Sequence, residues 1–395
     1  MIKDRELIEK EIDERELVEL AKDLVSIPSE NPPGDEERVS KVLIKWLHKI
    51  GFDVKTYTPK EKRVNVIGVL RGKRKEGGKT LIWNGHTDVV PAGDLNLWTH
   101  PPFEPRIVAG KLYARGSVDM KGAIASVLEG IAAIQRAGIK LNGSFVLQAV
   151  ADEEVMSHFG MEYLVNNGLV QGDAAIIGEP TGLKIEIAER GIVWPRITTH
   201  GVQAHASMPE LGINAIEKMS RLVPKLQAMK FKALQHPLLG KPTINVGTIG
   251  GGTKVNIVPD RCIIDVDRRT IPGETSNDVL GEIRKITEEL KKEDAELDVE
   301  IELVDYAEPS EISPNEEIVK ISENAVELVC GKRPKLRGMP GATDARFLIN
   351  QCNIPSVILG PGNTEQAHTA NEFVEIGELV KASKIYALIA AEFLG

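Results

Sequence analysis

The chain has 395 residues, which is more than one hydrophobic core usually serves, so we expect two domains. Hydrophobic residues make up 42% of it and charged residues 27%, a composition that is typical of globular proteins and excludes wholesale disorder. The formal net charge of −9 argues against nucleic acid or an anionic membrane as a partner.

The N-terminal segment is charged and amphipathic, unlike an apolar signal segment, and no apolar run approaches the roughly 20 residues that cross a bilayer. The three cysteines, Cys262, Cys330 and Cys352, are scattered and form no CxxC pair. They resemble neither a disulfide framework nor a thiolate zinc site. We interpret them as small hydrophobic residues in a reducing compartment and predict a cytoplasmic protein.

The first part of the chain alternates helices with short apolar strands. Helical periodicity covers residues 6–26, and a proline-rich loop separates this helix from one at roughly 36–50, which Asp35 or the preceding loop could cap. A third helix is predicted at 119–137. Five apolar segments are typical of buried strands: RVNVIGVL, KTLIWNG, SFVLQAVA, AAIIGE and SVILGPG. This alternation predicts an α/β domain with a mostly parallel sheet covered by helices.

The middle of the chain has a different order. A strand is followed by a helix at 213–230, two strands, a helix at 275–292 and a last strand, with KVNIVPDRCIIDVDRRT interpreted as a single strand. The order βαββαβ is that of a small α/β sandwich. We therefore predict that residues 184–306 are inserted into a domain formed by 1–183 and 307–395.

Four of the predicted strands lead into residues that can bind a metal ion. In open α/β sheets ligands bind beyond the carboxyl ends of the strands, so we expect these side chains to converge there, joined by an aspartate at the start of the 119–137 helix. In chain order the side chains are His86, Asp119, Glu153, Glu154, Glu179 and His368.

Each residue alone has a simpler explanation. Asp119 could be a helix N-cap, Glu153 and Glu154 solvated loop acids, and His368 a surface histidine. Taken together, the acids at one sheet edge would repel one another unless a cation neutralised them.

Two histidines and three carboxylates suit two divalent ions that share a bridging carboxylate, and these ligand types favour zinc, cobalt or manganese. One glutamate then remains as a base, and Asp88 remains to orient the imidazole of His86. Such a pair of ions is a hydrolytic centre.

Six stretches of the sequence resemble, in order and over nearly the whole chain, the M20 family of metallopeptidases and deacylases. They are NGHTDVVPAG, ARGSVDMKG, ADEEVMS, GEPTG, VQAHASMPELGINAI and AHTANE. The family includes acetylornithine deacetylase, succinyl-diaminopimelate desuccinylase, aminoacylase and the glutamate carboxypeptidases. The resemblance implies Asp119 as the bridging ligand, with His86 and Glu179 completing one metal site and Glu154 and His368 the other.

The resemblance also implies roles outside the metal ligands. Glu153 would be the general base, Asp88 would hold His86, and His205 of the inserted domain would reach the active site of the other subunit of a homodimer and stabilise the oxyanion. The substrate would contact Asn256, the backbone at Gly341 and one of two adjacent arginines; alignment on Pro272–Gly273 favours Arg269 over Arg268.

Glu179 stands where other branches of the family often carry aspartate, which favours the deacetylase and desuccinylase branch acting on an N-acyl amino acid. A carboxypeptidase or dipeptidase acting on short peptides with the same metals is the alternative within enzymes. A catalytically inactive binding protein of the same fold is a second alternative, and the intact set of ligands and base speaks against it.

Overall fold

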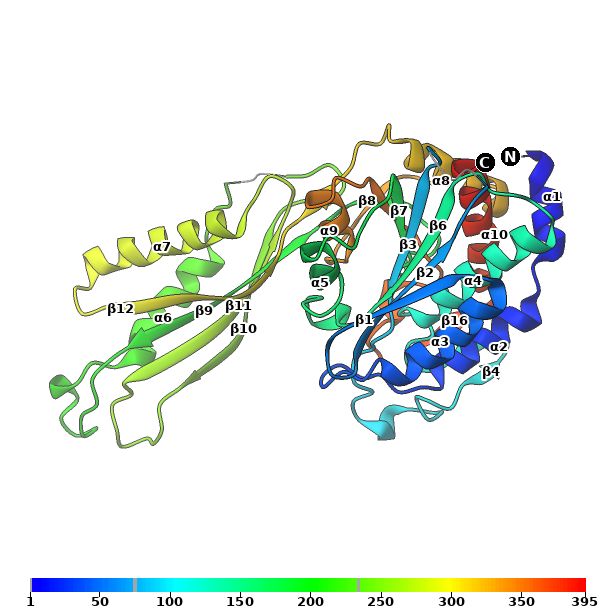
Figure 1. Cartoon of the computed structure of the whole chain (residues 1–395). Helices are drawn as coiled ribbons and strands as arrows, with labels where there is room; N and C mark the ends of the chain where they lie inside the picture. Colours follow the sequence, from blue (N-terminus) through cyan, green and yellow to red (C-terminus); the bar gives the residue numbers. More distant parts are fainter. Residues whose placement is uncertain (1, 74–76, 233–234) are drawn as a thin grey trace. The chain divides into compact units, whose positions relative to one another are not determined.

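The computed structural model describes residues 2–73, 77–232 and 235–395 and forms two compact units (Figure 1). The larger unit comprises Met1–Ile187, Ile312–Arg337 and Thr343–Gly395, and the smaller one Ala188–Glu311 and Gly338–Ala342. The expected insertion, 184–306, begins and ends a few residues earlier than the smaller unit. The smaller unit also includes the short segment Gly338–Ala342, which the order of predicted elements does not indicate.

The main sheet has the strand order β1-β2-β6-β3-β7-β15-β8-β13, with β14 also pairing with β8. Its central strands β6, β3, β7 and β15 run parallel, whereas β1, β2 and β8 join the flanks antiparallel. The predicted α/β class with a parallel centre is confirmed, and the antiparallel flanks are an addition to it. The strands are β1 Asp53–Lys60, β2 Arg63–Leu70, β3 Thr80–His86, β6 Ser144–Val150, β7 Ala174–Ile177, β8 Glu186–Glu189, β13 Ser310–Glu311, β14 Arg337–Met339 and β15 Ser356–Ile358.

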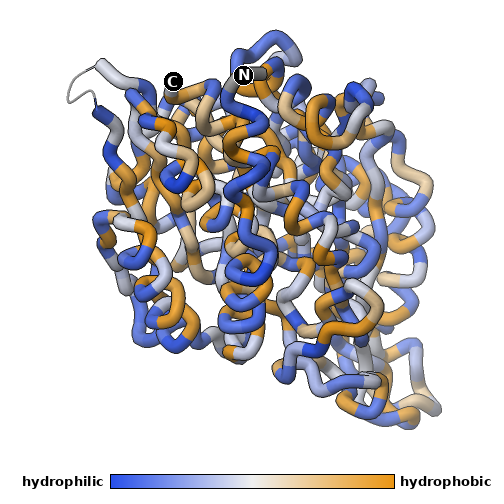
Figure 2. The backbone as a smooth tube through the Cα atoms, turned by 90° about the vertical axis from the view of Figure 1, so that its right-hand side faces the viewer, coloured by the Kyte–Doolittle hydropathy of each residue, from blue (hydrophilic) through white to orange (hydrophobic). Residues whose placement is uncertain are grey.

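Helices cover this sheet, which explains why its central strands are mostly buried and mostly apolar. The helix α4 is buried from Lys121 to Ile134 and packs against α2 and α10. Hydrophilic and hydrophobic residues alternate along the helices (Figure 2), as expected for helices with one face on a core. The helices of this unit are α1 Ile2–Glu11, α2 Glu14–Val25, α3 Glu37–Ile50, α4 Lys121–Arg136, α5 Met161–Asn166, α8 Glu317–Cys330, α9 Ala345–Asn350 and α10 Ile376–Phe393.

Two details of the N-terminal helices differ from the sequence-based expectation. The prediction of a single helix at 6–26 is wrong, because α1 ends at Glu11 and a second helix begins at Glu14. The side chain of Asp13 caps α2 by accepting hydrogen bonds from the backbone N–H groups of Arg15 and Glu16. The N-cap of α3 is Glu36 rather than Asp35, and its side chain makes no cap bond.

Short elements complete the larger unit. A small antiparallel sheet in the order β16-β5-β4 was not predicted; its strands are β4 Arg106–Val108, β5 Lys111–Tyr113 and β16 Phe373–Glu375. The 3₁₀ turns of the two units are η1 Leu95–Leu97, η2 Glu153–Val155, η3 Pro209–Leu211 and η4 Thr364–Gln366.

The smaller unit has the predicted order βαββαβ. Its four strands form an antiparallel sheet in the order β10-β11-β9-β12, packed on two helices through a core that includes Met219, Ile264 and Ile283. The predicted strand from Lys254 is wrong in its first part, because β11 begins only at Arg261 and Pro259 cannot donate to a strand ladder. The elements are β9 Gly191–His200, α6 Ala215–Gln227, β10 Thr243–Gly251, β11 Arg261–Thr270, α7 Ser276–Glu293 and β12 Asp298–Ala307.

Glu186 of β8 makes the stability of the larger unit depend on pH. Burial raises the pKa of this carboxyl from 4.5 to about 7, and its Oε2 atom has no hydrogen-bond partner among the described residues. The unfolded chain therefore loses the proton at lower pH than the folded chain, and stability falls as pH rises from about 4.5 to about 7.

We expect Glu186→Gln, which does not titrate, to unfold at a higher temperature than the wild type at pH 8 and at nearly the same temperature at pH 4. Thermal unfolding at both pH values measures the difference. Glu19→Gln, on the exposed face of α2, is the control and should show no such pH dependence. An equal effect of Glu186→Gln at both pH values would contradict the titration of Glu186.

Candidate metal centre

The side chains predicted to bind metal lie together where the central strands of the larger unit end. His86 is the last residue of β3, Glu154 lies in η2 directly after β6, and Glu179 follows β7. His368 lies in the loop after η4, and Asp119 lies two residues before the start of α4. The parallel pairing of β6, β3 and β7 explains this convergence, because the carboxyl ends of parallel strands meet at one edge.

Asp119 lies in the middle of the five side chains and faces both histidines. Its Oδ1 atom is 3.1 Å from Nε2 of His86, and its Oδ2 atom is 3.3 Å from Nε2 of His368. His86 Nε2 is also 3.6 Å from Oε1 of Glu179, and His368 Nε2 is 3.0 Å from Oε2 of Glu154. Two triplets therefore share Asp119, and within each triplet the candidate ligand atoms lie within 4.8 Å of one another.

The simpler explanation of Asp119 is wrong, because the N-cap position of α4 is Met120 and Asp119 directs its carboxylate to the two histidines.

The electrostatics of the cluster favour bound positive charge. Burial is the main cause that holds the pKa of Glu153 well above its ordinary value, and the negative charge of Glu179 adds to it. Burial and the charge of Asp119 raise the pKa of Glu179 in the same way. Hydrogen bonds to Asp119 and Glu154 raise the pKa of His368 to about 11. The Oε1 atom of Glu154 is buried and has no hydrogen-bond partner among the described residues. Imidazole and carboxylate groups in this arrangement fit two divalent ions of the zinc, cobalt or manganese type.

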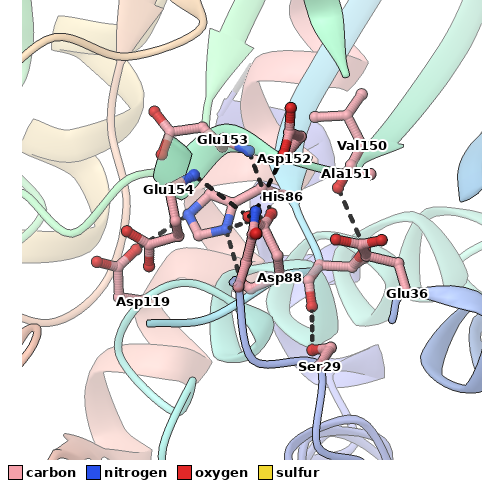
Figure 3. A network of polar contacts seen from close by, with 12 residues as sticks. Ser29, Glu36, His86, Asp88, Asp119, Val150, Ala151, Asp152, Glu153 and Glu154 are labelled. Atoms are coloured by element: carbon pink, nitrogen blue, oxygen red, sulfur yellow. Dashed lines mark hydrogen bonds and ion pairs between the residues drawn. The ribbon is translucent and has the colours of Figure 1, made fainter. Parts of the chain in front are cut away.

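Asp88 holds both the histidine and the turn that carries the adjacent glutamates (Figure 3). Its backbone carbonyl is 2.9 Å from Nδ1 of His86, which leaves Nε2 free for the metal side. Its carboxylate accepts the backbone N–H groups of Glu153 (3.2 Å) and Glu154 (3.3 Å). In Figure 3 the Glu154 carboxylate lies beside Asp119, whereas that of Glu153 points away from it. The geometry thus separates the two glutamates, with Glu154 in a triplet and Glu153 outside both.

Asp152, which no sequence pattern indicated, supports the same turn. Asp152 has the left-handed φ of 70°, and its Oδ1 atom accepts hydrogen bonds from Arg63 (2.6 Å) and from the Asn31 amide (3.1 Å). Asn31 also donates to Asp88 (2.9 Å). Asp152 lies in the stretch ADEEVMS, but Arg63 and Asn31 are 89 and 121 residues away from it along the chain, and this separation gave no sign that they would meet.

The remaining predicted residues lie in the smaller unit, where His205 and Asn256 occupy neighbouring loops. His205 forms an isolated antiparallel bridge with Ile257, and both His205 and Asn256 are exposed. The backbone N–H of Ser207 donates to Nδ1 of His205 (3.1 Å), so a neutral His205 carries its proton on Nε2.

The adjacent arginines of β11 differ in exposure. The side chain of Arg268 is 0% exposed and pairs with Glu274, whereas that of Arg269 is 31% exposed and pairs with Asp267 at 2.8 Å. Arg269 is therefore the one with a guanidinium that a ligand can reach. At Gly341 an added Cβ would meet no atom within 4 Å, so packing does not require glycine there.

Comparison with known proteins agrees with this centre. The chain matches the peptidase family M20/M25/M40 over residues 82–392. It belongs to this family. It is 30% identical over 389 residues to an acetylornithine deacetylase of Photorhabdus laumondii, with 95% of this chain and 97% of that protein covered. The M20 chain is therefore a metallohydrolase that acts on amide or peptide bonds.

Solved structures of the family share the fold. An M20 family metallo-carboxypeptidase from Sulfolobus solfataricus superposes with a TM-score of 0.81 at 21% identity, covering 96% of this chain and 99% of that one. A dinuclear metal-binding M20 peptidase of Bacillus subtilis gives a TM-score of 0.74 at 18% identity, covering 96% and 98%. Among the helices of the described residues, none is long and apolar enough to cross a membrane.

Proposed function

We propose that this M20 hydrolase uses two divalent ions to cleave the amide bond of an N-acyl amino acid. The observation that carries the proposal is the pair of triplets joined at Asp119, with a separate glutamate, Glu153, left outside both. Zinc is the ion that the ligand set suits best, with cobalt and manganese as substitutes. His86, Asp119 and Glu179 would hold one ion, and Asp119, Glu154 and His368 the other.

When bound, the ions would lower the pKa of a water molecule and polarise the carbonyl of the scissile amide. Glu153 accepts the proton of the attacking water at its carboxylate and passes it to the departing nitrogen. Asp88 keeps His86 in the tautomer with a free Nε2 and holds the turn that carries Glu153. His205, with its proton on Nε2, donates a hydrogen bond to the oxygen that becomes negative in the transition state.

The carboxylate of the substrate would bind in the smaller unit. Arg269 offers a partly exposed guanidinium, Asn256 an exposed amide, and Gly341 a backbone that a ligand can approach closely. The similarity to an acetylornithine deacetylase over 95% of the chain supports an N-acyl amino acid as the substrate class.

A substrate panel tests this class. We expect the enzyme with added zinc, cobalt or manganese to hydrolyse N-acetyl or N-succinyl amino acids faster than dipeptides that carry the same C-terminal residue. Preferential cleavage of the dipeptides would instead identify a carboxypeptidase or dipeptidase, and no hydrolysis of either set with metal bound would favour the inactive binding protein.

We propose that the working form is a homodimer built through the smaller unit. Among the described residues, β10 and β12 are the edge strands of its sheet, and a row of unpaired backbone groups at such an edge suits pairing with a second copy. The loops around His205 expose apolar side chains, with Val255 at 101% and Leu211 at 67% exposure. A second copy would cover these residues and receive His205 at its own metal centre. The cytoplasmic location stays a prediction from the sequence.

Metal content provides a direct test of the centre. The five candidate ligands form two triplets that share Asp119. We therefore expect elemental analysis after reconstitution to find up to two divalent ions per chain. Treatment with a chelator should remove activity, and added zinc, cobalt or manganese should restore it. Full activity in a chelated sample without detectable transition metal would contradict the proposal.

A further inference from the structure

Arg115 and Glu372 form a buried ion pair beside the metal centre, and neither belongs to the two triplets. Nη1 of Arg115 lies 2.6 Å from Oε2 of Glu372, and the two side chains are 2% and 0% exposed. Arg115 precedes Asp119 by four residues, and Glu372 follows His368 by four. Each member of the pair therefore lies in a loop that carries a candidate ligand.

The second oxygen of Glu372 binds the backbone of the bridging ligand. Oε1 accepts hydrogen bonds from the N–H groups of Val118 (2.9 Å) and Asp119 (3.2 Å). A charged carboxylate bound to two successive N–H groups fixes both peptide planes that precede the Asp119 side chain. These two bonds therefore set the direction in which the Asp119 side chain leaves the backbone. That direction places Oδ1 near His86 and Oδ2 near His368.

Arg115 adds a second bond to the loop of His368 and Glu372 and connects it to one further loop. Its Nη1 atom donates to the carbonyl of Thr369 (3.2 Å), the residue after His368. Its Nη2 atom donates to the carbonyl of Pro91 (3.4 Å), in the loop that follows His86 and Asp88. The fork of the guanidinium thus ties together the loops that hold His86, Asp119 and His368.

We propose that Glu372 is a positioning residue that sets the bridging geometry of Asp119 and thereby controls the binding of the second divalent ion. A single ion can adapt to one oxygen of a displaced Asp119, but two ions need both oxygens in fixed places. The inference rests on the proposed two-metal function and adds to it a residue that touches neither substrate nor metal.

The variant Glu372→Gln tests this role. Glutamine has the same size but offers one acceptor oxygen and no charge, so it cannot serve the two N–H groups and Arg115 together. Titration of the metal-free protein with Co²⁺, followed by calorimetry and visible absorption, gives the affinity for each equivalent. We expect the second equivalent to bind about 10–100-fold more weakly and the first to change less. Magnetic coupling between two bound Co²⁺ ions should weaken in parallel.

Glu129 offers a matched control. It is a buried glutamate that accepts the backbone N–H of Asp13 (2.7 Å) and pairs with Arg136. It lies ten residues beyond Asp119 on α4, or roughly 15 Å along the helix. Glu129→Gln should leave both Co²⁺ affinities unchanged. Glu372→Asp, which keeps the charge, should recover part of the lost affinity.

The results separate the inference from its premise. Wild-type affinity for both ions in Glu372→Gln, or an equal loss in Glu129→Gln, would overturn the positioning role while leaving the two-metal function standing. A wild-type chain that binds a single ion would overturn both. Should Glu372→Gln fail to fold, Glu372→Asp gives the comparison, because its shorter side chain draws the carboxylate away from the N–H groups of Val118 and Asp119. Wild-type binding of the second ion in that variant would equally refute the role.

Discussion

Replacing Glu153 with glutamine is expected to lower kcat by about 10²–10⁴-fold, which is the usual contribution of a general base. Its carboxylate lies outside both triplets, so glutamine removes the proton acceptor and leaves every candidate ligand in place. Metal content should therefore stay at the wild-type level. Steady-state kinetics at saturating substrate, together with elemental analysis of the same preparation, measure the two quantities.

Glu154→Gln is the matched control for this prediction because it changes the adjacent residue in the same way. Oε2 of Glu154 lies 3.0 Å from Nε2 of His368, in the second triplet. We expect this variant to bind one ion more weakly and to lose activity in proportion. The reverse pattern, with metal lost from Glu153→Gln and retained in Glu154→Gln, would exchange the roles of the two glutamates.

The sequence predicted the strand ends because buried parallel strands are mostly apolar and a residue that can bind a metal follows each apolar run. Glu179 follows this rule directly, and His86 follows it after the buried Asn84 of β3. The role of Asp119 could not be predicted in this way, since an aspartate before a helix is equally well explained as an N-cap. Only the arrangement of His86 and His368 around its two oxygens decides between the explanations.

The supporting residues could not be predicted, because they meet across long separations in the chain. Arg115 and Glu372 are 257 residues apart, and Arg63 and Asp152 are 89 apart. For the two arginines of β11, the alternation of side chains along the strand could have predicted which one is buried. Successive side chains of a strand point to opposite faces, so Arg268 follows Ile264 and Val266 onto the core face and Arg269 does not.

Replacing His205 with alanine is expected to lower kcat by about 10²–10³-fold without changing metal content, because the exposed Nε2–H of His205 would be lost as an oxyanion donor. In the proposed homodimer, this histidine serves the metal centre of the other chain. Mixing two inactive variants, Glu153→Gln and His205→Ala, tests it. Kinetics are measured before and after the subunits have exchanged.

If His205 acts on the other subunit, the His205→Ala chain supplies an intact Glu153 and receives an intact His205 from its partner. One site of each mixed dimer is then complete, and random exchange should return about a quarter of wild-type activity. If His205 acts within its own chain, every site in the mixture keeps one defect and no activity returns. A mixture of Glu153→Gln with Glu154→Gln provides the control. Each substitution damages the metal centre of the chain that carries it, so every metal centre in the mixture keeps one defect and exchange cannot assemble a complete site. Recovery in the first mixture alone would therefore identify His205 as the residue contributed by the partner.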